Sequence, residues 1–374
     1  MFIGITGTLY SGMSDIAKFL IQHHDFKLLA LETGHYELSQ DMQHLKLIDE
    51  LEPSSTSIDE KDLGLPVYET FKTNDDLVNY ATANWLQNFV IVSMKDMKLV
   101  DMLLKRPFFV LISVDSSLLT RFNRYSAQQK KEQKEQTVTA SSSDNDTIIN
   151  LTLHEFLSQT EPLKHANDAE LLKIMDKSHL KILNETTTPE QFHLNISQLQ
   201  LLNKERLRPS WDTYFMSLAD LAAHRSNCMK RRVGCVVVRN HRVVATGYNG
   251  TPRGTRNCNE GGCPRCNSAI SSGNGNGVSS VMGSGVGLST CLCLHAEENA
   301  LLEAGRDRVE GDSILYCNTC PCLTCTIKIV QSGVKEVVYS QSYSMDEFSS
   351  KVFKEAGVVL RQFTPPQYGV VVLQ

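Results

Sequence analysis

The chain has 374 residues, of which 41% are hydrophobic, and its formal net charge is −5. This length predicts about two domains, and the net negative charge gives no general attraction to nucleic acid. No apolar run reaches the roughly 18 residues of a membrane span, so we expect no membrane association. The N-terminus lacks the pattern of a signal peptide, which favours an intracellular protein, in the cytoplasm, the nucleus or both.

The first half of the chain, residues 1–203, is predicted to be an α/β domain. An apolar N-terminal strand, a glycine-containing loop and an amphipathic helix follow one another as in a P-loop unit. Further apolar segments, typical of strands that alternate with helices, occur at 89–92, 108–114 and 180–184.

The glycine loop departs from the P-loop pattern at one position. The spacing from Gly7 to Ser14 fits G-x-x-x-x-G-K-S/T, but Met13 occupies the place of the phosphate-binding lysine. Because a thioether cannot neutralise a phosphate, we expect a degenerate P-loop nucleotide-kinase-like domain. A working kinase is the alternative interpretation.

The stretch from Ser126 to Asp146 has almost no apolar residues. Such a segment cannot bury enough surface to offset the entropy lost on ordering. We therefore expect residues 126–146 to be a disordered insertion in the first domain. Its lysines are balanced by glutamates, which argues against a nucleic-acid role.

A polar segment at 203–209 marks the expected boundary to a second domain, residues 206–374. A helix is predicted near 211–223, followed by a hairpin. Later helices are expected from His295 to about Ala304, from Cys322, and at 349–356, in alternation with strands. One sheet with helices on both faces would bring the starts of the first two of these helices together.

Those two helix starts carry the chemistry predicted for this chain. A catalytic zinc ion usually has three protein ligands and an open position for water. His295, Cys322 and Cys325 supply the three ligands, and Glu297 is left free to carry protons. A Cys-x-x-Cys alone could be a redox pair or a structural zinc knuckle. H-x-E followed by P-C-x-x-C is instead the signature of zinc-dependent deaminases of bases and nucleotides.

The chain resembles the deoxycytidylate (dCMP) deaminase family, in particular its fungal type with an added N-terminal domain. The resemblance is close from about Arg206 onward and looser before it. It rests on the two zinc motifs and on the segments 225–228, 232–235, 247–253, 258–266 and 339–343. It implies a cytidine-deaminase-like three-layer α/β/α domain with a mixed sheet, which converts dCMP and water into dUMP and ammonia, for thymidylate synthesis. It also implies a homo-oligomer, commonly a hexamer, with dCTP as activator and dTTP as inhibitor.

The same resemblance suggests substrate residues. Asn249 and Tyr343 match family positions near the nucleotide, and Arg225 with Ser226 could hold the 5′-phosphate through charge-assisted hydrogen bonds. Each has a plainer interpretation. An asparagine between turn residues often serves backbone geometry, and an arginine that ends a helix can simply complement the helix dipole.

The cysteines predict a second metal. All 11 lie from Cys228 onward, near histidine and proline rather than spaced as a disulfide framework. Some family members have a structural zinc in this region, and we expect it here on Cys258, Cys263, Cys266 and Cys291, giving two zinc ions per chain. Cys228 is the first substitute, and ordinary buried thiols are the competing interpretation. The Gly/Ser-rich stretch 268–289 separates the last two predicted ligands.

Two other functions are compatible with the motifs. One is another pyrimidine deaminase, acting on a free nucleoside, a riboflavin precursor or tRNA, although the chain has no basic stripe for tRNA. The other is a zinc-folded regulatory or scaffold protein without catalysis. Glu297 argues against the latter, because a purely structural zinc site has no use for a free carboxylate.

Overall fold

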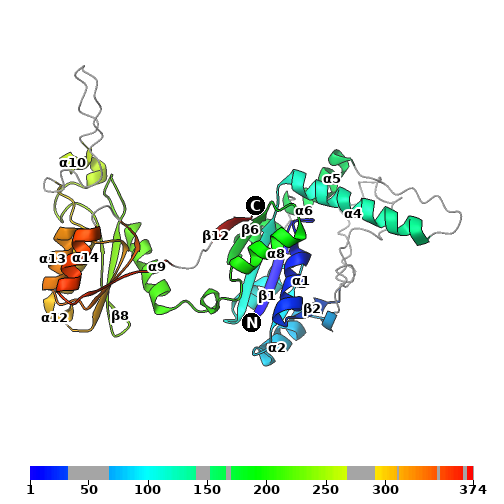
Figure 1. Cartoon of the computed structure of the whole chain (residues 1–374), viewed down its shortest axis with the longest axis horizontal. Coiled ribbons are helices and arrows are strands. Elements are labelled where there is room, and N and C mark those ends of the chain that lie inside the picture. Colours follow the sequence, from blue (N-terminus) through cyan, green and yellow to red (C-terminus); the bar gives the residue numbers. More distant parts are fainter. Residues whose placement is uncertain are drawn as a thin grey trace, which may run out of the picture. The chain divides into compact units, whose positions relative to one another are not determined.

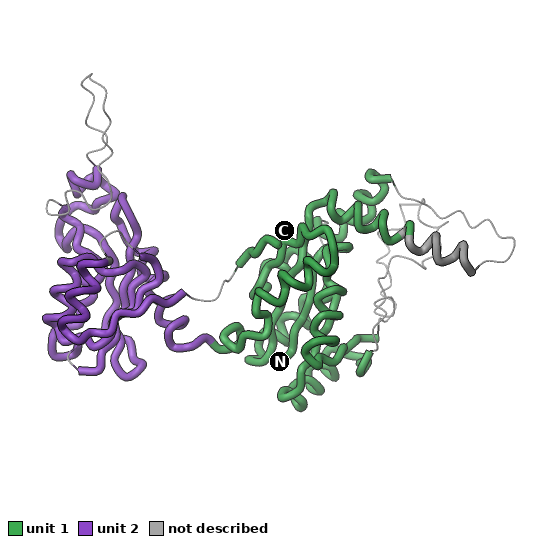
Figure 2. Tube along the Cα trace, viewed as in Figure 1, with its two compact units in different colours: residues 1–208, 367–374 green, residues 209–366 purple. Residues whose placement is uncertain are grey.

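The computed structural model describes residues 1–32, 67–139, 152–165, 170–267, 291–309, 311–342, 346–364 and 369–373. They form two compact units, Met1–Arg208 with Gln367–Gln374, and Pro209–Pro366 (Figure 2). Within the described ranges, no helix combines the length and the apolar character needed to cross a bilayer.

The first unit is built on a seven-stranded parallel sheet in the order β12-β6-β5-β1-β4-β2-β3 (Figure 1). Its central strand is buried on both faces, with Ile3 and Ile5 in one core and Phe2 in the other. Such double burial explains the continuous apolar sequence of this strand. The strands are β1 (Phe2–Gly7), β2 (Lys27–Leu31), β3 (Val67–Phe71), β4 (Phe89–Ile91), β5 (Phe109–Asp115), β6 (Leu180–Asn184) and β12 (Gly369–Leu373).

Helices cover both faces of this sheet. Ile16 of α1 and Phe192 of α8 pack in one core, whereas Leu77 of α2, Leu99 of α3 and Ile174 of α7 pack in the other. The helices are α1 (Met13–His24), α2 (Asn74–Ala83), α3 (Met97–Leu104), α4 (Leu118–Thr139), α5 (Leu153–Thr160), α6 (Pro162–His165), α7 (Leu171–Asp176) and α8 (Pro189–Gln198). The expected α/β architecture of the first half is therefore present.

The prediction that residues 126–146 are a disordered insertion is wrong for residues 126–139. Helix α4 continues through Ser126 as far as Thr139. Low hydrophobicity argues against burial but not against a helix. Glutamine, lysine and glutamate, which dominate this stretch, are good helix formers, and it contains no glycine or proline. Residues 140–146 of the predicted insertion lie outside the described residues.

The predicted domain boundary is also corrected, because the end of the chain belongs to the first unit. Strand β12 pairs in parallel with β6, from Gly369 opposite Leu180 to Leu373 opposite Asn184. The Leu373 side chain is 6% exposed and lies in the core beside α1. A sequence pattern of apolar residues predicts a strand but does not say which sheet it joins.

The second unit contains a mixed five-stranded sheet in the order β11-β10-β9-β7-β8. β7 is antiparallel to both neighbours, and β9, β10 and β11 run parallel to one another. The predicted hairpin is present, and both Asn240 and His241 in its turn have positive φ angles of 51° and 57°. The strands are β7 (Gly234–Arg239), β8 (Arg242–Tyr248), β9 (Ser313–Thr319), β10 (Glu336–Gln341) and β11 (Val359–Gln362).

The sheet of the second unit has helices on both faces, as the family resemblance implied. Phe215 and Ala219 of α9 pack on one face, and Ala300 of α11, Ile329 of α13 and Phe353 of α14 pack on the other. The principal helices are α9 (Trp211–Ala223), α11 (Ala296–Ala304), α13 (Leu323–Gln331) and α14 (Asp346–Glu355). Shorter helical segments of this unit are η4 (Cys258–Glu260), α10 (Pro264–Asn267) and α12 (Arg306–Val309), whereas η3 (Lys204–Arg206) belongs to the first unit.

Candidate zinc centre and cysteine cluster

The predicted catalytic ligands meet at the N-terminal ends of two helices. His295 is the N-cap of α11, and Cys322 is the N-cap of α13, one turn before Cys325. Nδ1 of His295 lies 3.3 Å from Sγ of Cys322 and 3.3 Å from Sγ of Cys325. Both helices pack on the same face of the sheet, and this shared packing brings together residues separated by 27 and 30 positions.

The three ligand atoms fit a zinc ion. Zn–N bonds of ~2.1 Å and Zn–S bonds of ~2.3 Å at tetrahedral angles separate a ligand nitrogen from a sulfur by about 3.6 Å. The observed separations of 3.3 Å are close to this value. With three protein ligands, a tetrahedral ion keeps one position open, as in catalytic zinc sites.

The acid–base character of the three side chains suits a cation. The hydrogen bond with Cys325 lowers the pKa of Cys322 to about 3, and the same contact raises the pKa of Cys325. The neighbouring Cys322 sulfur raises the pKa of His295. Metal ligation requires thiolate sulfur and an unprotonated ring nitrogen, so an ion bound here would take the place of protons on these atoms.

The proposed proton carrier, Glu297, lies in the first turn of α11 and is 4% exposed. Burial raises the pKa of its carboxyl group, although a hydrogen bond between its side chain and Cys325 opposes that rise. The next residue, Glu298, accepts a 2.9 Å hydrogen bond from the backbone N–H of His295 and forms an ion pair with Lys328 of α13. Glu298 thus fixes the start of α11 and links it to α13, a role that the sequence pattern did not indicate.

The loop that carries Asn249 adjoins this centre. Gly250 and Leu294 exchange backbone hydrogen bonds of 3.2 and 2.9 Å, directly before His295. Asn249 is itself 8% exposed, and its Oδ1 accepts from the backbone N–H of Val233 and the hydroxyl of Ser226.

The predicted substrate residues differ in their surroundings. The Asn249 amide also donates to the carbonyl of Arg231, so Asn249 and Ser226 hold the backbone of their own loops. Arg225 is exposed just after α9. Tyr343 lies outside the described residues.

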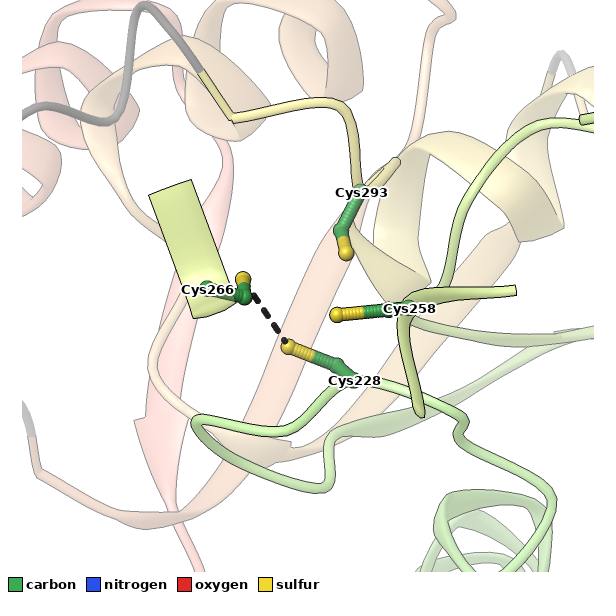
Figure 3. Close-up of side chains that lie close together, drawn as sticks. All are labelled: Cys228, Cys258, Cys266 and Cys293. Atoms are coloured by element: carbon green, nitrogen blue, oxygen red, sulfur yellow. Dashed lines mark hydrogen bonds between the residues drawn. The ribbon is translucent and has the colours of Figure 1, made fainter. Parts of the chain in front are cut away.

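Six further cysteines gather beside the loop that carries Asn249, in two overlapping groups. Cys228, Cys258, Cys266 and Cys293 form one group, drawn in Figure 3, and Cys263, Cys266, Cys291 and Cys293 form the other. Within each group all ligand atoms lie within 4.8 Å of one another.

The four cysteines predicted to hold a structural zinc are divided between these two groups. Cys258 belongs to the first, and Cys263 and Cys291 belong to the second, so the four predicted residues form no single group. The overlooked member, Cys293, belongs to both. Residues i and i+2 of an extended segment project to the same side, so the Cys-Leu-Cys spacing could have indicated it.

A helix-layered α/β unit with this histidine, these two cysteines and a buried glutamate has the features of a zinc-dependent deaminase. A family model described as the cytidine and deoxycytidylate deaminase zinc-binding region matches residues 209–341. The deoxycytidylate deaminase of Schizosaccharomyces pombe is 43% identical over 98% of this chain and 99% of its own length. That of Saccharomyces cerevisiae is also 43% identical, over 97% of each chain.

One similar solved structure is the dCMP deaminase of the cyanophage S-TIM5 in complex with dCMP and dUMP. It is 30% identical, with a TM-score of 0.32, and covers 42% of this chain and 98% of its own. Because the two fungal relatives match almost the whole length at 43% identity, the chain belongs to the deoxycytidylate deaminase family.

Proposed function

We propose that this protein is a zinc-dependent enzyme that deaminates dCMP hydrolytically to dUMP and ammonia. The observation that carries the proposal is the convergence of His295, Cys322 and Cys325 beside the buried carboxyl group of Glu297. Membership of the deoxycytidylate deaminase family supports the choice of substrate. The reaction breaks the bond between C4 and the amine and forms a bond between C4 and the oxygen of water.

In this proposal each residue has one role. Held by His295, Cys322 and Cys325, a zinc ion would lower the pKa of a water molecule to about 7. Glu297 accepts the proton that the water loses, delivers it to N3 of the cytosine ring and assists the departure of the amine as ammonia. Its burial excludes bulk water and raises the pKa of its carboxyl group, which favours the protonated form that it must adopt in mid-reaction.

Substrate contacts are part of the same proposal. We assign Arg225 to the 5′-phosphate, because a guanidinium can make charge-assisted hydrogen bonds to it, and Tyr343 to the nucleotide. Ser226 and Asn249 shape the loop that adjoins Leu294 and so border the substrate. Control by dCTP and dTTP, and assembly into a hexamer, rest on the family resemblance.

A parallel ultraviolet assay of dCMP, CMP, deoxycytidine and cytidine tests the substrate. We expect dCMP to have the highest kcat/KM, because the other three lack either the phosphate or the deoxyribose. A faster reaction with deoxycytidine or cytidine would refute the nucleotide assignment. Addition of dCTP or dTTP to the same assay tests the effectors. Light scattering of the protein as it elutes from a size-exclusion column tests the hexamer.

For the first unit we propose a degenerate P-loop domain that supports the structure and transfers no phosphoryl group. Side chains of the same unit hold the loop between β1 and α1. Arg124 donates to the carbonyls of Tyr10 and Ser11 at 3.1 Å, and Asn184 donates to the carbonyl of Ser11 at 2.8 Å. Met13 is 6% exposed and packs in the core.

A further inference from the structure

The sulfur atoms of the six-cysteine cluster are spaced as ligands of shared metal ions. Two thiolates on one tetrahedral zinc ion, with Zn–S bonds of ~2.3 Å, lie about 3.8 Å apart. The separations are 3.9 Å for Cys228 and Cys266, 3.8 Å for Cys263 and Cys291, and 3.8 Å for Cys266 and Cys291. These distances also exceed the ~2.05 Å of a disulfide bond, and all six cysteines are free.

The two groups of four cysteines have two members in common. Cys266 and Cys293 belong to both groups, Cys228 and Cys258 only to the first, and Cys263 and Cys291 only to the second. A single zinc ion would use four of the six sulfurs and leave two buried or half-buried thiols beside it. Two ions use all six, provided that the two shared sulfurs each bind both ions.

From this geometry we propose that the six cysteines hold two zinc ions, with the thiolates of Cys266 and Cys293 bridging them. The chain would then bind three zinc ions, one at the catalytic centre and two in the cluster. This inference rests on the cluster alone and does not depend on the proposed reaction.

The surroundings of the sulfurs match this division of roles. Backbone N–H groups of Lys230 and Arg231 point to Sγ of Cys228, and the N–H of Met229 donates to Sγ of Cys258 at 3.5 Å. Terminal thiolates are commonly stabilised by such donors.

The shared sulfurs have different neighbours. Sγ of Cys266 faces Cys228, Cys263 and Cys291, and Sγ of Cys293 faces Cys228, Cys258 and Cys266. A sulfur surrounded by other sulfurs is placed to bind two cations.

The charge balance also permits two ions. Four thiolates with one Zn²⁺ carry a net charge of −2, and six thiolates with two Zn²⁺ carry the same −2. The second ion displaces two protons from the remaining thiols, so it adds no net charge to this half-buried site.

The cluster has a structural task, because the buried core that its segments share is made of cysteines. The buried core here consists of Cys258, Cys263, Cys266 and Cys293, with Cys228 and Cys291 packed against it. A metal site contributes its binding free energy to folding where a hydrophobic core does not. Cys293 lies two residues before His295, so the two ions would also fix the approach to the catalytic centre.

Metal analysis of the dialysed full-length protein by plasma emission tests this proposal. We expect three zinc ions per wild-type chain. Cys228→Ser and Cys263→Ser should each lower the count to two, because each destroys one site and leaves the other complete, and Cys266→Ser should lower it to one. Cys325→Ser should remove only the catalytic ion. Cys235→Ala, which truncates a buried thiol outside all three groups, should leave three.

A wild-type count of two or one overturns the proposal. So does an unchanged count in either Cys228→Ser or Cys263→Ser, since one ion on a single group of four would leave the other pair dispensable. Should the variants not fold, ¹¹³Cd NMR of cadmium-loaded wild-type protein decides. Two mutually coupled resonances beside a third indicate bridging thiolates, whereas the absence of cadmium–cadmium coupling contradicts them.

Discussion

Gly247 of β8 lies against the backbone of Ala296, the residue between His295 and Glu297. A Cβ atom at Gly247 would fall 2.1 Å from the carbonyl oxygen of Ala296 and 2.5 Å from the backbone nitrogen of Ala300. The close approach of strand and helix therefore requires glycine, and it fixes the first turn of α11 relative to the sheet.

Gly247→Ala should displace α11 and lower both stability and turnover. Overpacking typically costs about 1–3 kcal/mol, and a shift of ~1 Å in a catalytic group can cost roughly 10²-fold in rate. Gly234→Ala is the matched control, because its Cβ would fall 2.0 Å from the carbonyl of Ala219 on α9, on the opposite face. It should destabilise the unit comparably while preserving kcat per folded molecule. Wild-type kcat and Tm in Gly247→Ala would contradict this account.

Glu297→Gln should retain zinc and fold but lose turnover, because an amide keeps the shape of the side chain and cannot carry protons. The expected loss in kcat is about 10²- to 10⁴-fold. Glu303→Gln, an exposed change on the same helix, should leave kcat unchanged. A loss below about tenfold, with zinc content intact, would show that Glu297 is not the proton carrier.

The stability of the first unit should depend on pH through His179. Nδ1 of His179 accepts a 3.0 Å hydrogen bond from the backbone N–H of Leu111, and burial lowers the pKa of the imidazole. As the pH falls, His179 of the unfolded chain binds a proton at about pH 6.5, and His179 of the folded chain does so only at a lower pH. The stabilisation is therefore present above pH ~6.5 and is lost as the pH falls through the lowered folded pKa.

Hydrogen exchange of the first unit between pH 7.5 and 5 measures this dependence. We expect the free energy of unfolding of the first unit to fall by on the order of 1 kcal/mol over this range, the size of one hydrogen bond. His179→Gln should flatten the profile, and the exposed His23→Gln should leave it unchanged. An identical slope in His179→Gln and wild type would assign the dependence to another group.

The C-terminal strand should stabilise the first unit, although it follows the deaminase half in sequence. Leu373→Ala removes a 6% exposed side chain from the core, and such truncations cost about 2–5 kcal/mol. Val372→Ala, on a 50% exposed neighbour in the same strand, should cost within about 1 kcal/mol. In Leu373→Ala we expect amide hydrogen exchange to be accelerated in β6 but not in β7. Equal effects of the two substitutions would argue against β12 as part of this core.

The full-length protein should transfer no phosphoryl group from ATP to nucleoside monophosphates. Met13 is buried where the phosphate-binding lysine belongs, and Arg124 donates a hydrogen bond to the carbonyl of Tyr10 in the loop. The assay requires the whole chain, because β12 completes the sheet of the first unit, and a Glu297→Gln background prevents deamination of the acceptor. Labelled phosphate in any monophosphate product would refute the degenerate P-loop.

Much of the catalytic chemistry was readable from the sequence. The ligand types, their order and the position of Glu297 are local properties, since each half of the motif lies within one turn of a helix start. The patterns that predicted strands and the hairpin were equally local, because alternating or continuous apolar residues and turn residues act over a few neighbours. Helix propensity in α4 is local too, but low hydrophobicity obscured it.

Tertiary structure alone decided how the six cysteines are grouped and which sheet the last strand joins. The six cysteines come from three separate segments of the chain, and spacing along the chain cannot reveal that Cys266 and Cys293 lie in both groups. Nor can it assign β12 to the first sheet, because an apolar strand pairs with whichever buried edge the whole fold presents. Local propensities fix what each segment becomes, whereas packing between segments fixes their neighbours, and metal sites depend on neighbours.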